Sequence, residues 1–166
     1  MYSADAKDEI ARARFDRACC PGTFVRALAA FSRRLRSADL YGRPADDKHR
    51  HDKYPRYQNL IVRTERGAIA RAALKAAKLS GIDAHATQMT GKRFHDGHVV
   101  VVAATGNTAL PARLDPPGRS CCRRAWLRAA FLACGSVTYP ARGYHLELFC
   151  RDDAAARALA KGFAEL

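Results

Sequence analysis

The stretch CCPGTFVRALAAFSRR, residues 19–34, decides the fold, because the chain contains a second version of it, CCRRAWLRAAFLACGS, at residues 121–136. The two stretches align at a shift of 102 residues, which pairs one Cys-Cys doublet with the other and Phe24 with Trp126. A second pair of similar stretches, LIVRTERGAIARAALK from Leu60 and LELFCRDDAAARALAK from Leu146, follows in the same order. A structural unit that occurs twice indicates a duplicated architecture, so the sequence predicts a molecule with pseudo-two-fold symmetry.

The composition is that of a folded, strongly basic protein. The chain has 166 residues, 48% of them hydrophobic, which is enough for one domain or for two small lobes around one core. A net charge of +13 makes nucleic acid the first candidate partner, although biased coding for Arg and Ala is an alternative origin. No apolar run approaches the roughly 20 residues of a membrane span. Residues 1–13 contain acids where a signal peptide needs cations, so we expect a cytoplasmic, nucleoid-associated protein without a membrane partner.

The six cysteines are expected to be reduced, because disulfides belong to oxidising compartments. Neither doublet has the two-residue spacer or the His partners of a structural zinc site, so the sequence predicts no metal and no cofactor. Thiols at the start of a helix have lowered pKa values, which leaves a redox role as an alternative to structural thiols. A second metal hypothesis concerns His49, His51 and Asp52, which lack a third, rigidly held ligand.

Apolar spacing and capping signals predict the order of the elements. We expect a peripheral N-terminal helix that Ser3 caps and that ends near Arg14. Strand 58–64 should alternate, with Leu60 and Val62 on one face and Arg63 on the other. The two repeat helices are expected at 20–36 and 120–133, and Ser120 should cap the second. Two more helices are expected at 66–79 and 107–114, and a last helix, capped by Asp152, should run to 166. The remaining strands are expected at 38–41, 84–89, 99–104, 137–139 and 144–150.

A duplicated unit of this kind, opened by a helix rich in small residues, resembles the LAGLIDADG homing-endonuclease fold. Residues 121–159 resemble the core of the WhiA family, bacterial regulators of sporulation and cell division, and SADAKDEIAR with the first doublet helix matches that family's opening. The resemblance implies an α+β fold of two αββαββα lobes. Residues 1–115 would form the first lobe, 116–119 a linker, and 120–166 the first half of a second, incomplete lobe, whose open sheet edge would favour self-association.

The resemblance also implies a DNA-binding transcriptional regulator, without the family's helix-turn-helix domain in these residues. Family endonucleases place one acid per repeat at the end of the repeat helix, because metal-dependent phosphodiester cleavage needs carboxylate ligands. The corresponding positions here are Ser32 and Cys134, which cannot replace a carboxylate. We therefore expect no catalytic residues and no enzyme activity. The alternatives are a nicking or RNA-processing enzyme that uses a shifted acid, Asp39, and a protein-interaction module.

In the LAGLIDADG fold, DNA lies across the open face of the sheet and meets strands and hairpin loops. The basic side chains on those elements are the candidate contacts to the phosphates of double-stranded DNA. Glu147 is expected on the same face and would repel phosphate. For Arg123, Arg124 and Arg128, salt bridges and phosphate contact both remain open. The candidate DNA-binding residues are Arg43, Lys48, Arg50, Lys53, Arg56, Arg63, Lys92, Arg93, His95, His98 and Arg142.

Overall fold

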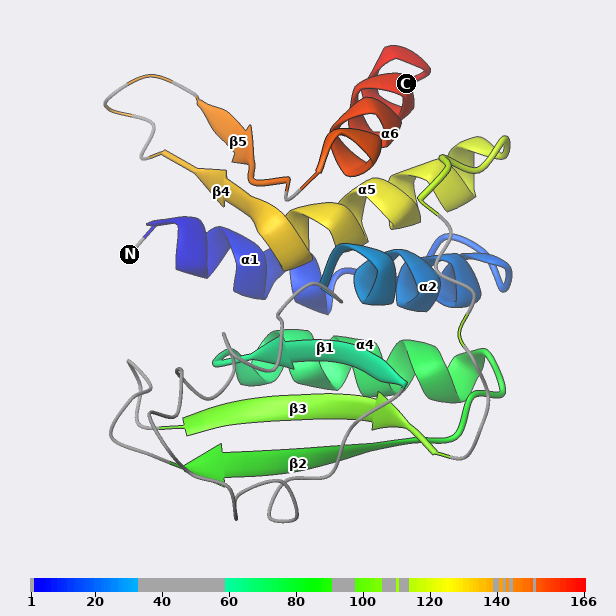
Figure 1. Ribbon diagram of the computed structural model, residues 1–166, viewed down its shortest axis with the longest axis vertical. Coiled ribbons are helices and arrows are strands. Elements are labelled where there is room, and N and C mark those ends of the chain that lie inside the picture. The colour runs from blue at the N-terminus through cyan, green and yellow to red at the C-terminus, as the bar shows by residue number, and fades with distance from the viewer. Residues whose placement is uncertain are drawn as a thin grey trace, which may run out of the picture.

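The structure is a computed structural model, and it describes residues 2–32, 59–90, 98–105, 110, 114–138, 141, 143, 145–150 and 152–166. Its helices and strands form an α+β fold in which two repeat helices lie between a three-stranded sheet and a two-stranded sheet (Figure 1). The predicted fold class is confirmed. Within the described ranges no helix has the length and apolar character that a bilayer crossing requires.

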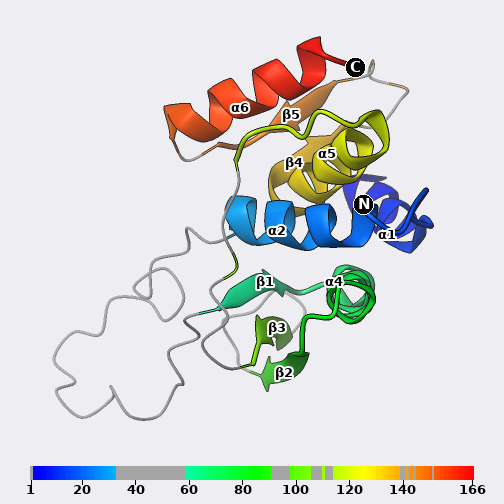
Figure 2. The same ribbon diagram turned by 90° about the vertical axis from the view of Figure 1, so that its right-hand side faces the viewer.

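The two repeat helices, α2 (Cys20–Ser32) and α5 (Ser120–Cys134), lie side by side and share the largest contact between any two described elements (Figures 1 and 2). Small residues make this contact possible, since Ala27, Ala129 and Ala130 are fully buried. Helix axes approach closely where no large side chain separates them. The small residues that the two repeat helices share are therefore what allows the helices to pack closely.

The first lobe contains an antiparallel sheet of β1 (Leu60–Thr64), β2 (Ala84–Thr90) and β3 (His98–Ala104) in the order β1-β3-β2. Helix α4 (Gly67–Leu79) packs on one face of this sheet, and α2 lies across α4 and β1 (Figure 2). The three strands and α4 match the predicted ranges within one or two residues, whereas residues 33–36 of the predicted range for α2 lie outside the described part of the chain. Seven residues of α4 are buried, six of them alanine, so close packing anchors this helix.

The predicted alternation along β1 is wrong, because the strand contains an irregularity between Leu60 and Val62. Both Ile61 and Val62 are buried in the main core, at 0% and 2% exposure. A bulge inserts one extra residue into the ladder, so the residues beyond it change face. Leu60 and Arg63 consequently share one face of the sheet, opposite Ala103 and Val101 of β3.

The second lobe consists of α5, the short strands β4 (Gly135–Val137) and β5 (Leu146–Leu148), and α6 (Asp153–Ala164). The predicted cap is confirmed, since the Asp152 carboxylate accepts a hydrogen bond of 2.8 Å from the Ala155 amide. Trp126 joins α2, α5 and α6, because its buried ring meets Phe31 edge-on at 5.3 Å and packs against Gly162. β4 begins directly after α5, two residues earlier than predicted.

The N-terminal helix α1 (Tyr2–Arg12) is not peripheral, because it contacts α4, α5 and β4. Arg66, at the start of α4, forms an ion pair of 3.3 Å with Asp8. Two predicted caps are wrong. Ser3 lies inside α1, where its Oγ accepts a hydrogen bond from the Val137 amide, and Ser120 is the first residue of α5 rather than its cap.

Some sequence predictions concern residues outside the described part of the chain. They are the strand at 38–41, the metal hypothesis at His49, His51 and Asp52, the alternative acid Asp39, and most of the helix at 107–114.

Candidate functional site at the paired helices

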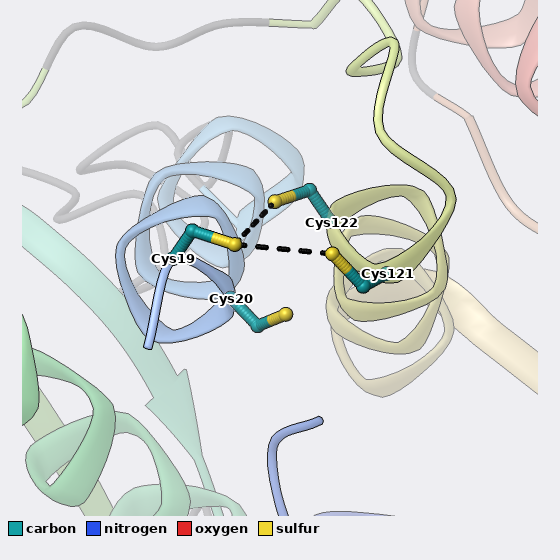
Figure 3. A group of neighbouring side chains, drawn as sticks. All are labelled: Cys19, Cys20, Cys121 and Cys122. Atoms are coloured by element: carbon teal, nitrogen blue, oxygen red, sulfur yellow. Dashed lines mark hydrogen bonds between the residues drawn. The ribbon is translucent and has the colours of Figure 1, made fainter. Parts of the chain in front are cut away.

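Four cysteines meet where the paired helices begin (Figure 3). Cys19 precedes α2 and Cys20 begins it, while Cys121 and Cys122 lie in the first turn of α5. The Cys19 sulfur lies 3.8 Å from that of Cys121 and 3.4 Å from that of Cys122, and all four sulfurs lie within 4.8 Å of one another. The structure contains these residues as free thiols. Neither doublet alone has the spacing of a zinc site, but the fold brings the two doublets together.

The environment of the cluster separates Cys19 from the other thiols. Burial raises the pKa of Cys20 to about 12, and burial also raises the pKa of Cys122. The pKa of Cys19 is lowered, first by its hydrogen bond with Cys122. Cys19 is only partly buried, whereas Cys20, Cys121 and Cys122 are buried. The cluster therefore contains one partly buried thiol with a lowered pKa, Cys19, beside two buried thiols with raised pKa values, Cys20 and Cys122.

The opposite ends of the same helices line a hollow of about 370 Å³. Ser32, the last residue of α2, and Cys134, the last residue of α5, both line it. Because the helices begin together at the cysteines and end together here, they run parallel. The hollow thus lies where the homing-endonuclease resemblance places the two catalytic acids.

Two cationic side chains line this hollow together with Ser32 and Cys134. Lys7 of α1 and Arg63 of β1 both reach it. Burial lowers the pKa of Lys7, which the neighbouring Cys134 partly offsets. Burial raises the pKa of Cys134 to about 11, and its thiol donates a hydrogen bond of 3.1 Å to the Ala130 carbonyl. Cys134 is therefore a neutral thiol at pH 7.

Asp152 is the only carboxylate among the described residues that line the hollow. One of its oxygens accepts from the Ala155 amide and so caps α6. Sequence reasoning identified Asp152 as a cap but not as part of this site, because it lies 18 residues beyond Cys134 (152 minus 134). The Ser32 hydroxyl, which also lines the hollow, is buried, and no hydrogen-bond partner for it lies among the described residues. A single carboxylate that already caps a helix is a poor basis for metal-dependent cleavage.

Only two of the predicted DNA-binding residues lie in the described part of the chain, Arg63 and His98. Arg63 pairs with Val101, whereas His98 stands three residues earlier on β3 and pairs with Thr90. Successive strand residues point to opposite faces, so the structure places Arg63 and His98 on opposite faces of the sheet. Residues of the predicted set that lie outside the described ranges are Arg43, Lys48, Arg50, Lys53, Arg56, Lys92, Arg93, His95 and Arg142.

The three arginines that follow the second doublet all make internal contacts. Arg123 forms an ion pair of 3.1 Å with Glu165, and Arg124 forms one of 2.6 Å with Asp16. The Arg128 guanidinium stacks on Phe15 and on Phe24, at 4.6 and 4.9 Å from the ring centroids. Between the alternatives left open by the sequence, these contacts favour a structural role.

Comparison with known proteins agrees with this architecture. Residues 123–166 match the model of the WhiA LAGLIDADG-like domain. The chain is 32% identical over 170 residues to the "Probable cell division protein WhiA" of Desulforudis audaxviator, covering 91% of this chain and 49% of that protein. It is 29% identical over 185 residues to the Heliobacterium modesticaldum protein of the same name. That match covers 96% of this chain and 51% of that protein.

Two solved structures share the fold. The N-terminal LAGLIDADG domain of DUF199/WhiA superposes with a TM-score of 0.67 at 16% identity, over all of this chain and 75% of that one. Full-length DUF199/WhiA from Thermatoga maritima superposes with a TM-score of 0.68 at 16% identity, over all of this chain and 50% of that one. The duplicated lobes and the parallel helix pair define a protein with a LAGLIDADG-like fold. The chain is similar to the WhiA proteins over most of its length, and it spans about half the length of the curated relatives it matches.

Proposed function

We propose that the chain is a DNA-binding unit of a transcriptional regulator of the sporulation and cell-division type, which acts at the nucleoid and binds duplex DNA without cutting it. The relatives carry the name of a cell division protein and not of an enzyme. A net charge of +13 suits a polyanionic partner. Contacts to phosphates would supply most of the affinity, so binding should be sensitive to salt.

The observation that carries this proposal is the composition of the hollow at the shared end of α2 and α5. Ser32 and Cys134 provide no hard oxygen anion, and Lys7 and Arg63 make the site attractive to phosphate and repulsive to a divalent cation. Cleavage of the phosphodiester would require carboxylates to hold the metal. The scaffold therefore has a hollow where a nuclease of this fold acts, and Asp152 is the one carboxylate that the described residues place there.

The DNA-contacting cations would come from the sheet and its loops and not from α5. Arg123 and Arg124 are held in ion pairs. Arg63 is the best-placed candidate among the described residues, because it lies on the face of β1 opposite α4 and also lines the hollow. The candidate residues beyond the described ranges complete the proposed set, whereas His98 lies on the other face of the sheet and is left out of it.

A plasmid assay tests this function. Supercoiled plasmid is incubated with the protein and Mg²⁺ or Mn²⁺, and the products are resolved after removal of the protein. While the protein is bound, the plasmid should migrate more slowly but remain intact. After the protein is removed, the plasmid should migrate as the untreated supercoiled form does. Nicking that disappears in Asp39→Asn or in Asp152→Asn would contradict the proposal and favour the nicking enzyme instead.

Self-association is a second part of the proposal. Leu146 and Phe149 are exposed at β5, at 49% and 66%, and exposed apolar side chains at a strand are a common association surface. Sedimentation velocity of the wild type and of Leu146→Lys tests it. A concentration-dependent increase in mass that the substitution abolishes is expected, and a monomer at all concentrations would contradict it.

A further inference from the structure

The four cysteines at the start of the paired helices form a cluster that the proposed DNA-binding function does not use. Each sulfur has the other three as close neighbours, and the cluster is mostly buried. Thiols are weak hydrogen-bond donors and acceptors, so mutual contact alone stabilises such an arrangement only slightly. Four soft donors that converge on one point are, in contrast, the ligand set of a thiophilic metal ion.

We propose that Cys19, Cys20, Cys121 and Cys122 bind one tetrahedral zinc ion, which links the two repeats at their pseudo-dyad. With Zn–S bonds of about 2.3 Å, a tetrahedral site has sulfurs about 3.8 Å apart. The distances of 3.4 and 3.8 Å from Cys19, and the limit of 4.8 Å for all pairs, fit that size. An iron–sulfur cluster needs more widely separated thiolates, because several iron and sulfide atoms must lie between them.

The surroundings can stabilise the double negative charge of a zinc ion with four thiolates. Both doublets lie at helix N-termini, where unpaired backbone amides and the helix dipole favour anions. The side chain of Arg119 interacts with Cys19, and the hydroxyl of Thr23 interacts with Cys122. Partners of this kind around the ligands orient them and raise the affinity for metal.

The ligand arrangement follows from the duplication. Each repeat supplies one adjacent pair, so neither pair alone can complete a four-ligand site. A bound ion would join residues that lie 102 positions apart, and metal binding would contribute directly to the stability of the helix pair. The inference does not depend on the proposed DNA binding.

Metal content and cobalt substitution test the site. The full chain is purified under reducing conditions without chelators, and its zinc is measured by mass spectrometry. We expect one equivalent of zinc per chain. After removal of zinc, Co²⁺ should give the intense visible absorption of a tetrahedral tetrathiolate site, and Mg²⁺ should not compete with it.

Two ligand variants and one matched control locate the metal. Cys19→Ser and Cys121→Ser should each weaken Co²⁺ binding by about a hundredfold or more, since even the loss of a residue behind the ligands typically costs about 10–100-fold. Cys150→Ser, which alters a partly buried thiol outside the cluster, should bind as the wild type does. Should the ligand variants fail to fold, the zinc content and cobalt spectrum of the wild type decide. A folded wild type without zinc or cobalt affinity, undiminished binding in Cys19→Ser, or a disulfide from Cys19 to Cys121 or Cys122 would overturn the proposal.

Discussion

The Sγ atom of Cys19 lies 3.8 Å from the Sγ atom of Cys121, the residue at the same position in the second repeat. In a two-fold arrangement a residue meets its own equivalent only close to the axis. The neighbouring contacts are reciprocal, because Cys19 contacts Cys122 and Cys20 interacts with Cys121. The internal repeat in the sequence is therefore a pseudo-dyad in the structure, with the cysteines at one end of the helix pair and the hollow at the other.

Arg63 is expected to contact a phosphate. Arg63→Ala should lower DNA affinity similarly for all sequences and reduce the slope of log K against log salt by about 1. Fluorescence anisotropy with labelled duplexes at several salt concentrations measures both quantities. The matched control is Arg157→Ala, which removes the same charge from a side chain on α6 that is 76% exposed. Equal slopes for the two variants would show that Arg63 contributes only through net charge.

Asp152 is expected to weaken DNA binding while it stabilises α6. Asn caps helices about as well as Asp, so Asp152→Asn should change the free energy of unfolding by less than about 0.5 kcal/mol. The substitution removes the one carboxylate of the hollow among the described residues, and DNA affinity at low salt should therefore rise several-fold. Asp153→Asn removes a carboxylate that is 92% exposed and serves as the control. Similar gains in both variants would argue against phosphate near the hollow.

Gly162 allows α6 to pack on Trp126. A Cβ atom at this position would lie 2.6 Å from Cζ3 of the indole, which is only 2% exposed. Alanine improves helix propensity by about 1 kcal/mol, but forced repacking of a core costs about 1–3 kcal/mol. Gly162→Ala should therefore destabilise the protein by about 1 kcal/mol in urea unfolding.

Two further variants isolate the steric cause. Gly118→Ala, where the added Cβ atom meets nothing within 4 Å, should not lower stability. In combination with Trp126→Phe, the cost of Gly162→Ala should decrease, because the smaller ring leaves room for the methyl group. Additive costs in this double-mutant cycle would contradict the proposed clash.

Cys134 should make stability decrease at alkaline pH. Its pKa is raised by burial from 9.0 to about 11, so the unfolded chain loses this proton at lower pH than the folded one. The stabilisation that the neutral thiol contributes is present below pH 9.0 and is lost as the pH rises toward 11. Cys134→Ala should therefore lose less unfolding free energy than the wild type between about pH 8 and about pH 10. Urea unfolding at both pH values measures this difference, and identical losses would show that Cys134 is not desolvated.

The sequence was sufficient where local signals determine the structure. The apolar stripe of α2 and the Asp152 cap each depend on residues close together in the chain, and the repeat is visible by comparing the sequence with itself, so all three are predictable. The face that Arg63 occupies depends on a bulge in the pairing of β1 with β3, which no pattern within β1 reveals. The packing of α1 against α4, α5 and β4 does not follow from its composition, because polar residues dominate this helix.

The candidate sites illustrate the same limit. Ser32 and Cys134 could be located from the repeat alone, and they line one hollow as the resemblance implied. The cysteine cluster could not be recognised from spacing, because its two halves are brought together by the parallel packing of α2 and α5. Ligand motifs within a short stretch are visible in a sequence, whereas ligands shared between two repeats become visible only after the repeats are placed around their axis.

The most direct test of the central claim, that this scaffold holds duplex DNA through its phosphates, is the salt dependence of binding by the wild-type chain. A labelled duplex is titrated with protein across a series of NaCl concentrations, and log K is plotted against log salt. The account predicts a straight line with a negative slope of several units and similar affinity for unrelated sequences. Affinity that does not change with salt, or no binding at low salt, would contradict it.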